Sequence, residues 1–374
     1  MLQKRDGHSG AIEGLLPVLD VPVEPSPRHS PSRRRRSPKK VLNRRHNDQS
    51  QAVRSSVQIV FLLLNLLIGL QFLLWVRYFE SGGSTWQIGR PPGVEGWLPI
   101  ASLMNLKAWI MTGVVTQIHP AGMFLLVAFL AISVLIKKSF CSWLCPIGTI
   151  SEALWKGGEK LFGRNFRLPK WFDIPLRSLK YLLLGLFVYA VGSMPVEGIK
   201  AFLEGPYGVV ADVKMLNFFR YLSLTGVIVI SFLMLLSVLV KNFWCRYLCP
   251  YGALMGLVGM LSPNKIRRDT ELCVDCGKCA KACPSNLPVD QLVVVNSAEC
   301  FACMQCVASC PSAQALELRG PGRFQLRPWM AAAAISIVFL GVVAGARLTG
   351  HWHTQLPDDV YFDLVPRAEQ FSHP

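Results

Sequence analysis

The sequence predicts an all-α membrane bundle of about five transmembrane helices joined to a small α+β module that holds two metal clusters. Two observations predict this fold class: five apolar stretches of nearly membrane-spanning length, and eight cysteines arranged in two identically spaced runs. The composition agrees, because only 17% of the 374 residues are charged and 51% are hydrophobic. Soluble domains of this length usually carry more charge.

The apolar stretches have the length that a bilayer demands. A hydrocarbon layer about 30 Å thick needs roughly 20 apolar residues in a helix. The expected spans cover residues 57–76, 121–136, 178–194, 221–240 and 329–346. The alternative is that one or two of the shorter stretches are buried helices of a soluble domain.

Lys and Arg are distributed unevenly among the segments that connect these spans. Residues 1–56, 137–177 and 241–327 carry 12, 8 and 10 of them, whereas residues 77–120 and 195–219 carry 3 and 2. Basic loops stay in the cytoplasm, so we expect the N-terminus and all twelve cysteines there and residues 347–374 as an extracytoplasmic tail. In a reducing compartment these cysteine spacings indicate metal ligands rather than disulfides.

Residues 1–56 read as a disordered basic cytoplasmic arm. They are rich in Pro, Ser and Arg, including four consecutive arginines at 33–36, and they show almost no apolar periodicity. The simplest interpretation is a charged tail that sets topology. Attraction to anionic lipid and binding of nucleic acid are the alternatives, and we expect no nucleic-acid partner.

A short internal repeat lies within residues 57–261, the expected four-helix membrane domain. Residues 140–148 and 244–252 share the pattern aromatic-Cys-x-aromatic-Leu-Cys-Pro-x-Gly. Each copy would close an out-to-in helix, so two parallel halves should face one another about an axis normal to the membrane. The spacing i, i+4 places each cysteine pair on one helical face before a proline. The cysteines of the two pairs are Cys141, Cys145, Cys245 and Cys249.

Three interpretations of these four membrane cysteines remain open. They form a possible extra metal site, either iron–sulfur or a soft ion such as Cu(I), a redox-active dithiol, or small buried residues without chemistry. The sequence alone does not bring the two pairs within bonding distance.

Residues 262–318 form a polar module with two C-x₂-C-x₂-C-x₃-C-P runs, which is a highly specific pattern for 4Fe–4S clusters. Three thiolates of each run hold one cluster, and the fourth reaches the other cluster. The ligands predicted for cluster I are Cys273, Cys276, Cys279 and Cys310, and those predicted for cluster II are Cys300, Cys303, Cys306 and Cys283. A pair of zinc sites is the structural alternative, but zinc ribbons separate two cysteine pairs by a longer spacer.

Small residues beside these cysteines let backbone amides approach the cluster sulfurs, which tunes the reduction potential. Gly277 of the first run is replaced at the matching position of the second run by the bulkier Met304.

The histidines limit the cofactors and suggest one proton acceptor. None of the seven lies in an expected span, so haem b, which needs facing axial ligands, is not predicted. No nucleotide is predicted either, because no glycine-rich phosphate loop opens a helix. His119, at the outer mouth of the second span, is a candidate catalytic residue for taking a quinol proton, and an ordinary interfacial role is its alternative. His351 and His353 are expected to form an interfacial cap or, less favoured, to bind a metal.

Two Cys-x₃-Cys-Pro elements followed by the two cysteine runs resemble the membrane polyferredoxin family, which includes NapH, the C-terminal halves of NosR and NirI and, more loosely, CcoG. The resemblance covers about residues 45–318. It implies a double-cluster bacterial-ferredoxin module in a multi-pass protein of the bacterial inner (cytoplasmic) membrane. Residues 329–346, an expected fifth transmembrane helix, and the tail after it go beyond NapH-like chains.

The function implied is membrane-bound electron transfer through two 4Fe–4S clusters, linked to quinol or quinone. The expected partners are membrane lipid, the quinone pool and a redox protein, and a quinol dehydrogenase subunit is the enzymatic role that would fit. The alternative is a metal-handling, copper-reducing or oxidase/reductase assembly factor that uses the same clusters. A cluster-based sensor acting through the basic arm is less favoured, because no output domain is recognisable.

Overall fold

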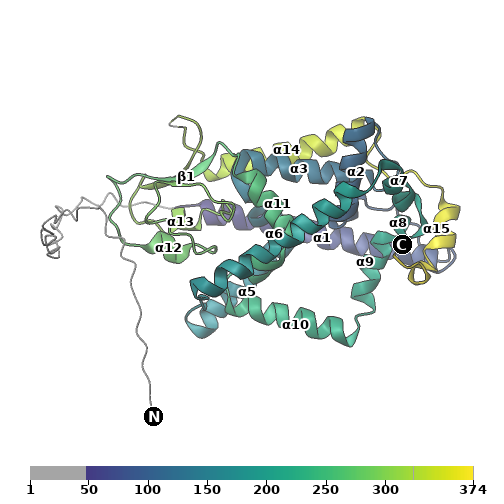
Figure 1. Cartoon of the computed structure of the whole chain (residues 1–374), viewed down its shortest axis with the longest axis horizontal. Helices are drawn as coiled ribbons and strands as arrows, with labels where there is room; N and C mark the ends of the chain where they lie inside the picture. Colours follow the sequence, from purple (N-terminus) through teal and green to yellow (C-terminus); the bar gives the residue numbers. More distant parts are fainter. Residues whose placement is uncertain (1–47, 323, 374) are drawn as a thin grey trace, which may run out of the picture. The chain divides into compact units, whose positions relative to one another are not determined.

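The computed structural model describes residues 48–322 and 324–373, and these residues are mostly helical (Figure 1). The expected basic arm therefore lies outside the described residues except for its end, which is helical because the first helix begins at Ser50. The longer helices are α1 (Ser50–Glu80), α2 (Pro99–Thr112), α3 (Pro120–Ile136), α5 (Pro146–Phe162), α6 (Lys170–Ser193), α7 (Val196–Glu204), α9 (Ala211–Arg220), α10 (Leu224–Leu239), α11 (Pro250–Gly259) and α14 (Pro328–Leu348).

Short helical turns connect the longer helices, and most of the cysteines lie in or beside such turns. These turns are α4 (Phe140–Trp143), α8 (Pro206–Val209), α12 (Lys278–Ala282), α13 (Gln305–Ala308), α15 (Asp358–Leu364), the 3₁₀ segments η1 (Pro92–Trp97), η2 (Lys137–Ser139) and η4 (Ala368–Gln370), and the π-helical turn η3 (Trp244–Leu248).

Among the described residues, four helical stretches are long and apolar enough to cross a membrane, or up to five if one bent pair counts as a span. They are α1, the stretch Pro120–Trp143, which contains α3, the turn η2 and α4, Trp171–Ser193 and α14. The bent pair is α9 and α10, which meet at 82°. Helix α10 has 16 residues, and at 1.5 Å per residue it is shorter than a 30 Å hydrocarbon layer. The span expected at residues 221–240 is therefore not a single straight helix that crosses the layer by itself.

The long helices pack side by side. Helix α3 contacts α14, α2 and α11, and α1 contacts α14 and α5. Figure 1 shows α1, α3 and α14 running together, with β1, α12 and α13 at one end and α7, α8 and α15 at the other. Helix α10 contacts α5 and leaves most of its apolar surface uncovered, including Leu224 and Phe232.

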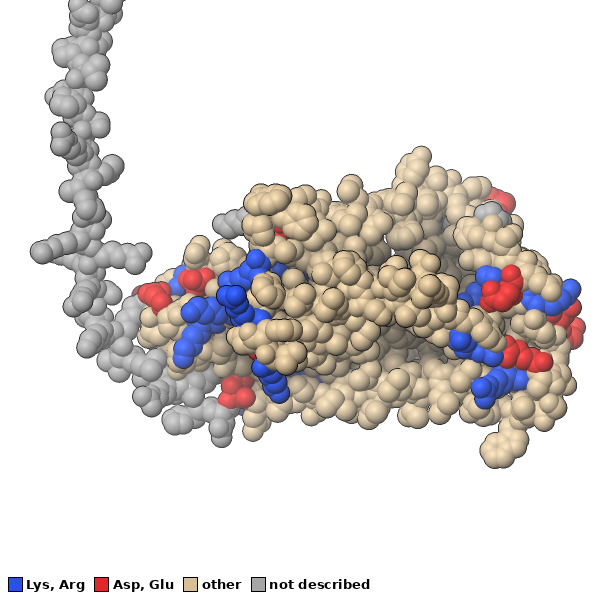
Figure 2. Space-filling model, turned by 90° about the horizontal axis from the view of Figure 1, so that it is seen from below, with Lys and Arg blue, Asp and Glu red and all other residues tan. Residues whose placement is uncertain are grey.

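Charged side chains are segregated along the long axis. Figure 2 shows Lys, Arg, Asp and Glu gathered at the two ends of this face, with an uncharged band between them. Apolar side chains of α1 and α6 are exposed, for example Leu67 (63% exposed) and Leu182 (67% exposed). A soluble protein rarely exposes so much contiguous apolar surface, whereas lipid covers it at no cost.

Among the described residues, the two larger hydrophobic cores lie along this axis. The first runs along α3 and α14 and continues into the cysteine module through Phe301 and Ile266. The second joins the end of α1 to α2, α7 and α15, where Trp75 packs edge to face on Tyr361 with ring centroids 4.9 Å apart. The segment between α1 and α3 and the tail after α14 thus share a packed core with the end of α1.

The cysteine module contains a three-stranded antiparallel sheet in the order β2-β1-β3. The strands are β1 (Lys265–Arg268), β2 (Val294–Val295) and β3 (Leu316–Arg319). Ile266 on the central strand pairs with Val295 on one side and Leu318 on the other. All three side chains are buried, so one face of this small sheet supplies an apolar wall to the cysteine loops.

Candidate functional site

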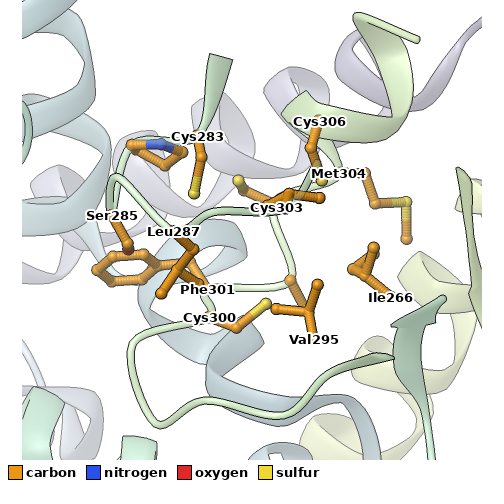
Figure 3. A pocket seen from close by; sticks show the side chains of 13 residues that line it. Ile266, Cys283, Ser285, Leu287, Val295, Cys300, Phe301, Cys303, Met304 and Cys306 are labelled. Atoms are coloured by element: carbon orange, nitrogen blue, oxygen red, sulfur yellow. The ribbon is translucent and has the colours of Figure 1, made fainter. Parts of the chain in front are cut away.

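The second cysteine set lines one enclosed space. Cys283, Cys300, Cys303 and Cys306 surround a cavity whose other walls are mainly apolar (Figure 3). All four side chains are at most 9% exposed. These are the four residues that the crossed pattern predicts for cluster II, although Cys283 comes from the other run. Thiols projecting into a dry apolar space are the donor set that an iron–sulfur cluster requires.

The backbone of both runs has the same shape. Asp275 and Gly277 in the first run, and Ala302 and Met304 in the second, have positive φ angles between 48° and 67°. L-residues rarely adopt this left-handed conformation, yet it recurs at matching positions, and a short helix follows each time: α12 or α13. Met304 is only 2% exposed and lines the cavity, so this bulkier residue shields the second set from solvent.

The first cysteine set is more open to solvent than the second. Cys276 is exposed, and the other three members are half-buried. Cys279 lies close enough to Cys310 for their thiols to interact electrostatically, and these two residues belong to the set predicted for cluster I. The members of this set are Cys273, Cys276, Cys279 and Cys310.

The membrane cysteine pairs differ from the expected geometry. Cys141 lies in α4 and Cys245 in η3, but Cys145 and Cys249 have extended backbones and cap the following helices, α5 and α11. The prediction that each pair shares one continuous helical face is therefore wrong, because Pro146 and Pro250 start new helices. At this cap position the Gly252 amide donates to Cys249 Sγ at 3.3 Å.

The two membrane pairs nevertheless converge. All four thiol side chains line one cavity of about 810 Å³, and Cys245 interacts electrostatically with each of the other three. Gly148 is required for this approach, since a Cβ atom there would meet the Cys141 carbonyl oxygen at 2.0 Å. Among the described residues, no three His, Cys, Asp or Glu side chains come close enough to hold a single metal ion. Ligands of a polynuclear cluster stand farther apart, because the cluster itself separates them.

The same cavity extends from the membrane cysteines to the end of the bundle where Arg90 and Trp352 lie, here called the outer end. Its walls include Phe129 and Phe140, stacked with ring centroids 3.9 Å apart, and Tyr251, packed at their edges. At its other end it reaches Arg90 and His353. A largely apolar chamber of this size with a few polar groups suits a small amphipathic ligand.

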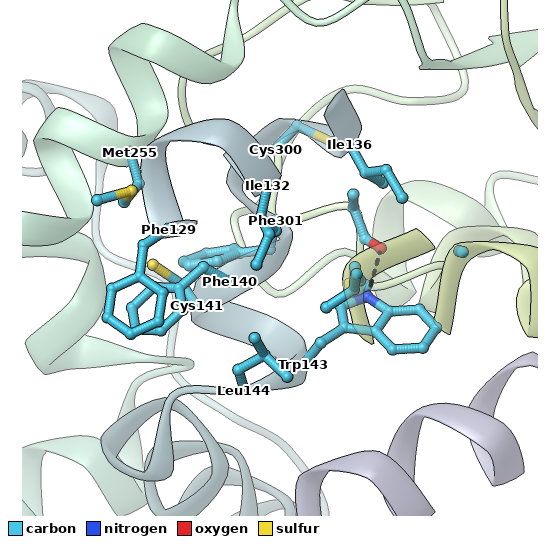
Figure 4. Close-up of a cluster of buried hydrophobic side chains, with 14 of the residues drawn as sticks. Phe129, Ile132, Ile136, Phe140, Cys141, Trp143, Leu144, Met255, Cys300 and Phe301 are labelled. Atoms are coloured by element: carbon cyan, nitrogen blue, oxygen red, sulfur yellow. Dashed lines mark hydrogen bonds between the residues drawn. The ribbon is translucent and has the colours of Figure 1, made fainter. Parts of the chain in front are cut away.

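The loop that carries the second cysteine set is hydrogen-bonded to the membrane helices. Gln51 of α1 donates to the Cys303 carbonyl (3.0 Å), Ser142 to that of Phe301 (2.6 Å) and Trp143 to that of Ala302 (3.3 Å). The dashed line in Figure 4 marks the Trp143 bond, beside Phe140 and Cys141. Three successive carbonyls are thus fixed to the bundle.

These contacts place the second set next to the membrane cysteines. Cys141 and Cys245 line a small pocket together with Pro284, Phe301 and Cys303. Cys303 also lines the cavity of the second set, so the two cysteine sites share a wall. The sequence did not predict this neighbourhood, since it depends on contacts between segments far apart in the chain.

His119 belongs to a buried charged network at the outer end. Arg90 donates to Glu95 (2.6 Å) and Asp212 (2.7 Å), and Arg90 Nη2 lies 3.1 Å from His119 Nδ1. His119 Nε2 lies 2.9 Å from the Gly208 carbonyl oxygen, so Nε2 carries a hydrogen, and Nδ1 also lies 3.6 Å from Glu95 Oε1. Burial lowers the pKa of His119, but Glu95 raises it more. His119 is 1% exposed and is therefore not a simple interfacial residue. It contacts Arg90, which lines the cavity, without lining it itself.

Glu95 is the electrostatic centre of this outer network. Burial raises the pKa of Glu95, but the charge of Arg90 lowers it more, so that the pKa falls to about 2. The sequence did not identify Arg90, Glu95 and Asp212 as functional residues. In the sequence, Arg90 and Glu95 stand out only as isolated charges between apolar segments. His353 lines the cavity, and Trp352 beside it is buried.

Known protein families match the regions of both cysteine sites. A 4Fe-4S binding domain matches residues 118–169 and again residues 222–269, and a 4Fe-4S dicluster domain matches residues 265–317. The first covers both membrane cysteine pairs, and the second covers all eight cysteines of the two runs. With the apolar helices, these matches define the class: an iron–sulfur protein of the ferredoxin type built onto helices of membrane-spanning length.

Individual relatives identify the family. YccM of Escherichia coli strain K12, named as a proposed electron transport protein, is 48% identical over 326 residues, which are 86% of this chain and 91% of YccM. The ferredoxin-type protein NapH of the same organism is 30% identical over 184 residues, 46% of this chain and 59% of NapH. NirI of Paracoccus denitrificans is 25% identical over 260 residues, 66% of this chain and 37% of NirI.

The chain belongs to the membrane polyferredoxin family, as its cysteine motifs predicted. No solved structure matches it.

Proposed function

We propose that this protein is a membrane-bound electron relay that passes single electrons between the quinone pool and a partner redox protein. The observation that carries the proposal is the continuity of the cysteine sites. The large cavity meets the four membrane cysteines, two of these share a pocket with Cys303, and Cys303 lines the space of the second set. From there the first set leads to solvent at Cys276.

Two 4Fe–4S clusters with crossed ligands supply the one-electron chemistry when bound. Cys300, Cys303, Cys306 and Cys283 would hold the buried cluster, and Cys273, Cys276, Cys279 and Cys310 the exposed one. Cys279 interacts electrostatically with Cys310, and the second set surrounds one cavity, which supports this division. The exposed set is where a partner redox protein would approach.

A third iron–sulfur cluster at Cys141, Cys145, Cys245 and Cys249 would bridge the cavity and the buried set. The 4Fe-4S binding domain match covers both pairs. Backbone amides also point at the capping thiols, as at Gly252 and Cys249. Such amides stabilise the negative charge of a bound cluster.

The cavity would hold the quinone ring between the aromatic side chains and the membrane cysteines. Phe129, Phe140 and Tyr251 exclude water and supply flat apolar contacts. At the outer end Arg90 is held by Glu95 and Asp212 and backed by His119. The Arg90 guanidinium keeps its protons, so it would bind the quinone head group rather than relay a proton. His119, next to Arg90, is the group of this network that would take a quinol proton.

The orientation that we propose for the chain in the membrane follows from the distribution of Lys and Arg. The cysteine-rich segments carry the excess of Lys and Arg, which favours the cytoplasmic side of the bacterial inner membrane. The N-terminus and the ferredoxin module would then be cytoplasmic, and the tail after α14 extracytoplasmic. The charge-free band in Figure 2 would lie in the lipid.

The test is reduction of the purified protein in lipid nanodiscs by a short-chain quinol, followed by electron paramagnetic resonance of the clusters. We expect low-potential cluster signals that respond to quinol or quinone in the wild type. The double variant Cys141→Ser/Cys245→Ser should keep the ferredoxin clusters, reducible by dithionite, but lose the quinol response. Clusters indifferent to every quinone would overturn the proposal. Copper bound by the wild type and lost in the variant would then favour the metal-handling alternative.

A further inference from the structure

Lys138 is a buried lysine at the junction between the membrane helices and the cysteine module. It follows α3 in the turn η2, where Lys137 has φ 51° and ψ −155°, a conformation rarely adopted by residues other than glycine. The turn directs the Lys138 side chain inward, and the residue is only 1% exposed. A strained turn that buries a charge suggests a role for that charge.

The Lys138 ammonium has no hydrogen-bond partner among the described residues. It lies over the Phe301 ring, 4.5 Å from the centroid. Gly252 makes room for it, because a Cβ atom there would stand 3.3 Å from Lys138 Nζ. Other buried lysines nearby are paired, such as Lys180, which donates to Glu299 at 2.6 Å. A buried ammonium without a partner is costly, so an anion is expected to face it.

The electrostatic neighbours of Lys138 are thiols from two cysteine sites. Its charge acts on Cys141, Cys145 and Cys245 of the membrane set and on Cys300 of the second set. The carboxylate within its range is Glu299. Lys180 already pairs with that carboxylate, so the region holds more cationic charge than its carboxylate balances.

We infer that the Lys138 ammonium is the counter-charge of an anionic iron–sulfur cluster held by the four membrane cysteines, and that it raises the reduction potential of that cluster. The inference rests on the cluster proposed above for this site. Four thiolates give a cluster net negative charge, and reduction adds one electron and one further negative charge. A fixed positive charge nearby stabilises the reduced state. The step is a transfer of one electron, and the chain moves no proton in it.

The position of the Lys138 ammonium favours electron flow from a quinol to the membrane cluster. A raised potential lets the membrane site accept an electron from a quinol more readily than an uncompensated four-thiolate cluster would. Because Cys300 also lies within range of the ammonium, the buried set should respond in the same direction, though less, since one of its four thiols is involved rather than three. The exposed set should not respond.

The test is a redox titration of Lys138→Met, monitored by electron paramagnetic resonance on the full chain in nanodiscs. Methionine nearly matches lysine in length and leaves no unpaired buried charge, so the variant should fold. We expect the reduction equilibrium of the membrane cluster to fall about tenfold, which is about 59 mV for one electron. Lys138→Arg should stay close to the wild type. Lys156→Met removes a half-exposed lysine of α5 and should leave the potential unchanged.

Iron analysis separates the two proposals. Three clusters require about twelve irons per chain, falling to about eight in Cys141→Ser/Cys245→Ser. If the iron count falls in this way but Lys138→Met shifts no potential, the role of Lys138 is refuted and the proposed relay stands. If wild type and cysteine variant both hold about eight irons, the membrane cluster is absent and the inference fails with it. An equal shift in Lys138→Met and Lys156→Met would also refute it, because the effect would then reflect total charge.

Discussion

The Arg54 guanidinium donates to both carboxylate oxygens of Glu152, with Nη1 to Oε2 at 2.6 Å and Nη2 to Oε1 at 2.5 Å. Arg54 is fully buried, and Glu152 is 8% exposed. Gln305 of α13 donates to the same carboxylate at 2.9 Å. Since Arg54 lies on α1 and Glu152 on α5, this ion pair connects the first membrane-spanning helix and α5 to the helix that follows Cys303.

Replacing Arg54 with Met should uncouple this junction. The substitution leaves Glu152 buried without its main partner, and breaking a buried pair in this way costs about 3–5 kcal/mol. We expect the free energy of unfolding in detergent micelles to fall by that order. The measurement is a denaturant titration followed by the iron–sulfur absorbance and by circular dichroism.

The matched control is Lys156→Met, which removes the other cation on Glu152. Lys156 is 44% exposed, and exposed ion pairs contribute about 0–1 kcal/mol. Equal losses in the two variants would show that burial of the Arg54 pair has no special importance.

Crossed ligation predicts which cluster each cysteine variant loses. Cys283→Ser should remove the buried cluster, because Cys283 lines the cavity of the second set. The remaining cluster should then be the exposed one, bleached rapidly by a water-soluble chelator or ferricyanide. In Cys279→Ser the exposed cluster should be lost and the survivor should bleach slowly. Slow bleaching of the survivor in both variants would mean that each run holds its own cluster, because Cys279 and Cys283 would then serve the same cluster and the buried cluster of the second run would survive in each case.

Local features of the sequence predicted the long apolar helices well. The length of an apolar run is a local property, so the runs at 57–76 and 329–346 fall inside α1 and α14. The separation of Cys283 from its own run also follows from the spacing rule, and the cavity brings it together with Cys300. Helix α10 was less predictable, because its bend against α9 depends on packing rather than on composition.

The relation between the sites could not be read from the sequence. The hydrogen bond from Trp143 to Ala302 joins segments 159 residues apart, and no periodicity encodes such a contact. Buried charges were likewise invisible: Lys138 and Arg54 counted only as basic residues that set topology. Their burial is a tertiary property, and a sequence pattern cannot distinguish a lysine that faces a cluster from one in water.

The outer network should make stability depend on pH through Glu95. Its pKa is lowered to about 2 in the folded protein from an ordinary value of 4.5, so its contribution is complete above about pH 4.5. That contribution should be lost as the pH falls toward 2, because protonation then removes the charge that Arg90 stabilises. The shift corresponds to about 3 kcal/mol at neutral pH.

The measurement is the difference in unfolding free energy between the wild type and Glu95→Gln. The difference should shrink between about pH 4.5 and 2 as Glu95 is protonated. It should also decline as the pH rises through the raised pKa of His119, because Glu95 stabilises the charged imidazole. Asp363→Asn on the exposed end of α15, where the side chain is 61% exposed, serves as the control and should change little. A difference that does not vary with pH would contradict the charge-based account.

Filling the large cavity should block the quinol response without harming the clusters. Val343 on α14 lines this cavity, whereas Ile337 on the same helix is 71% exposed and would face lipid. Val343→Trp places an indole in the space proposed for the quinone ring, so we expect quinol-driven reduction to slow at least tenfold while dithionite still reduces every cluster. Ile337→Trp adds the same bulk to the lipid-facing side and should reduce at the wild-type rate. Filling a cavity that binds no quinone should not change the rate of reduction by quinol. An unchanged rate in a folded Val343→Trp variant would therefore show that the quinone binds elsewhere.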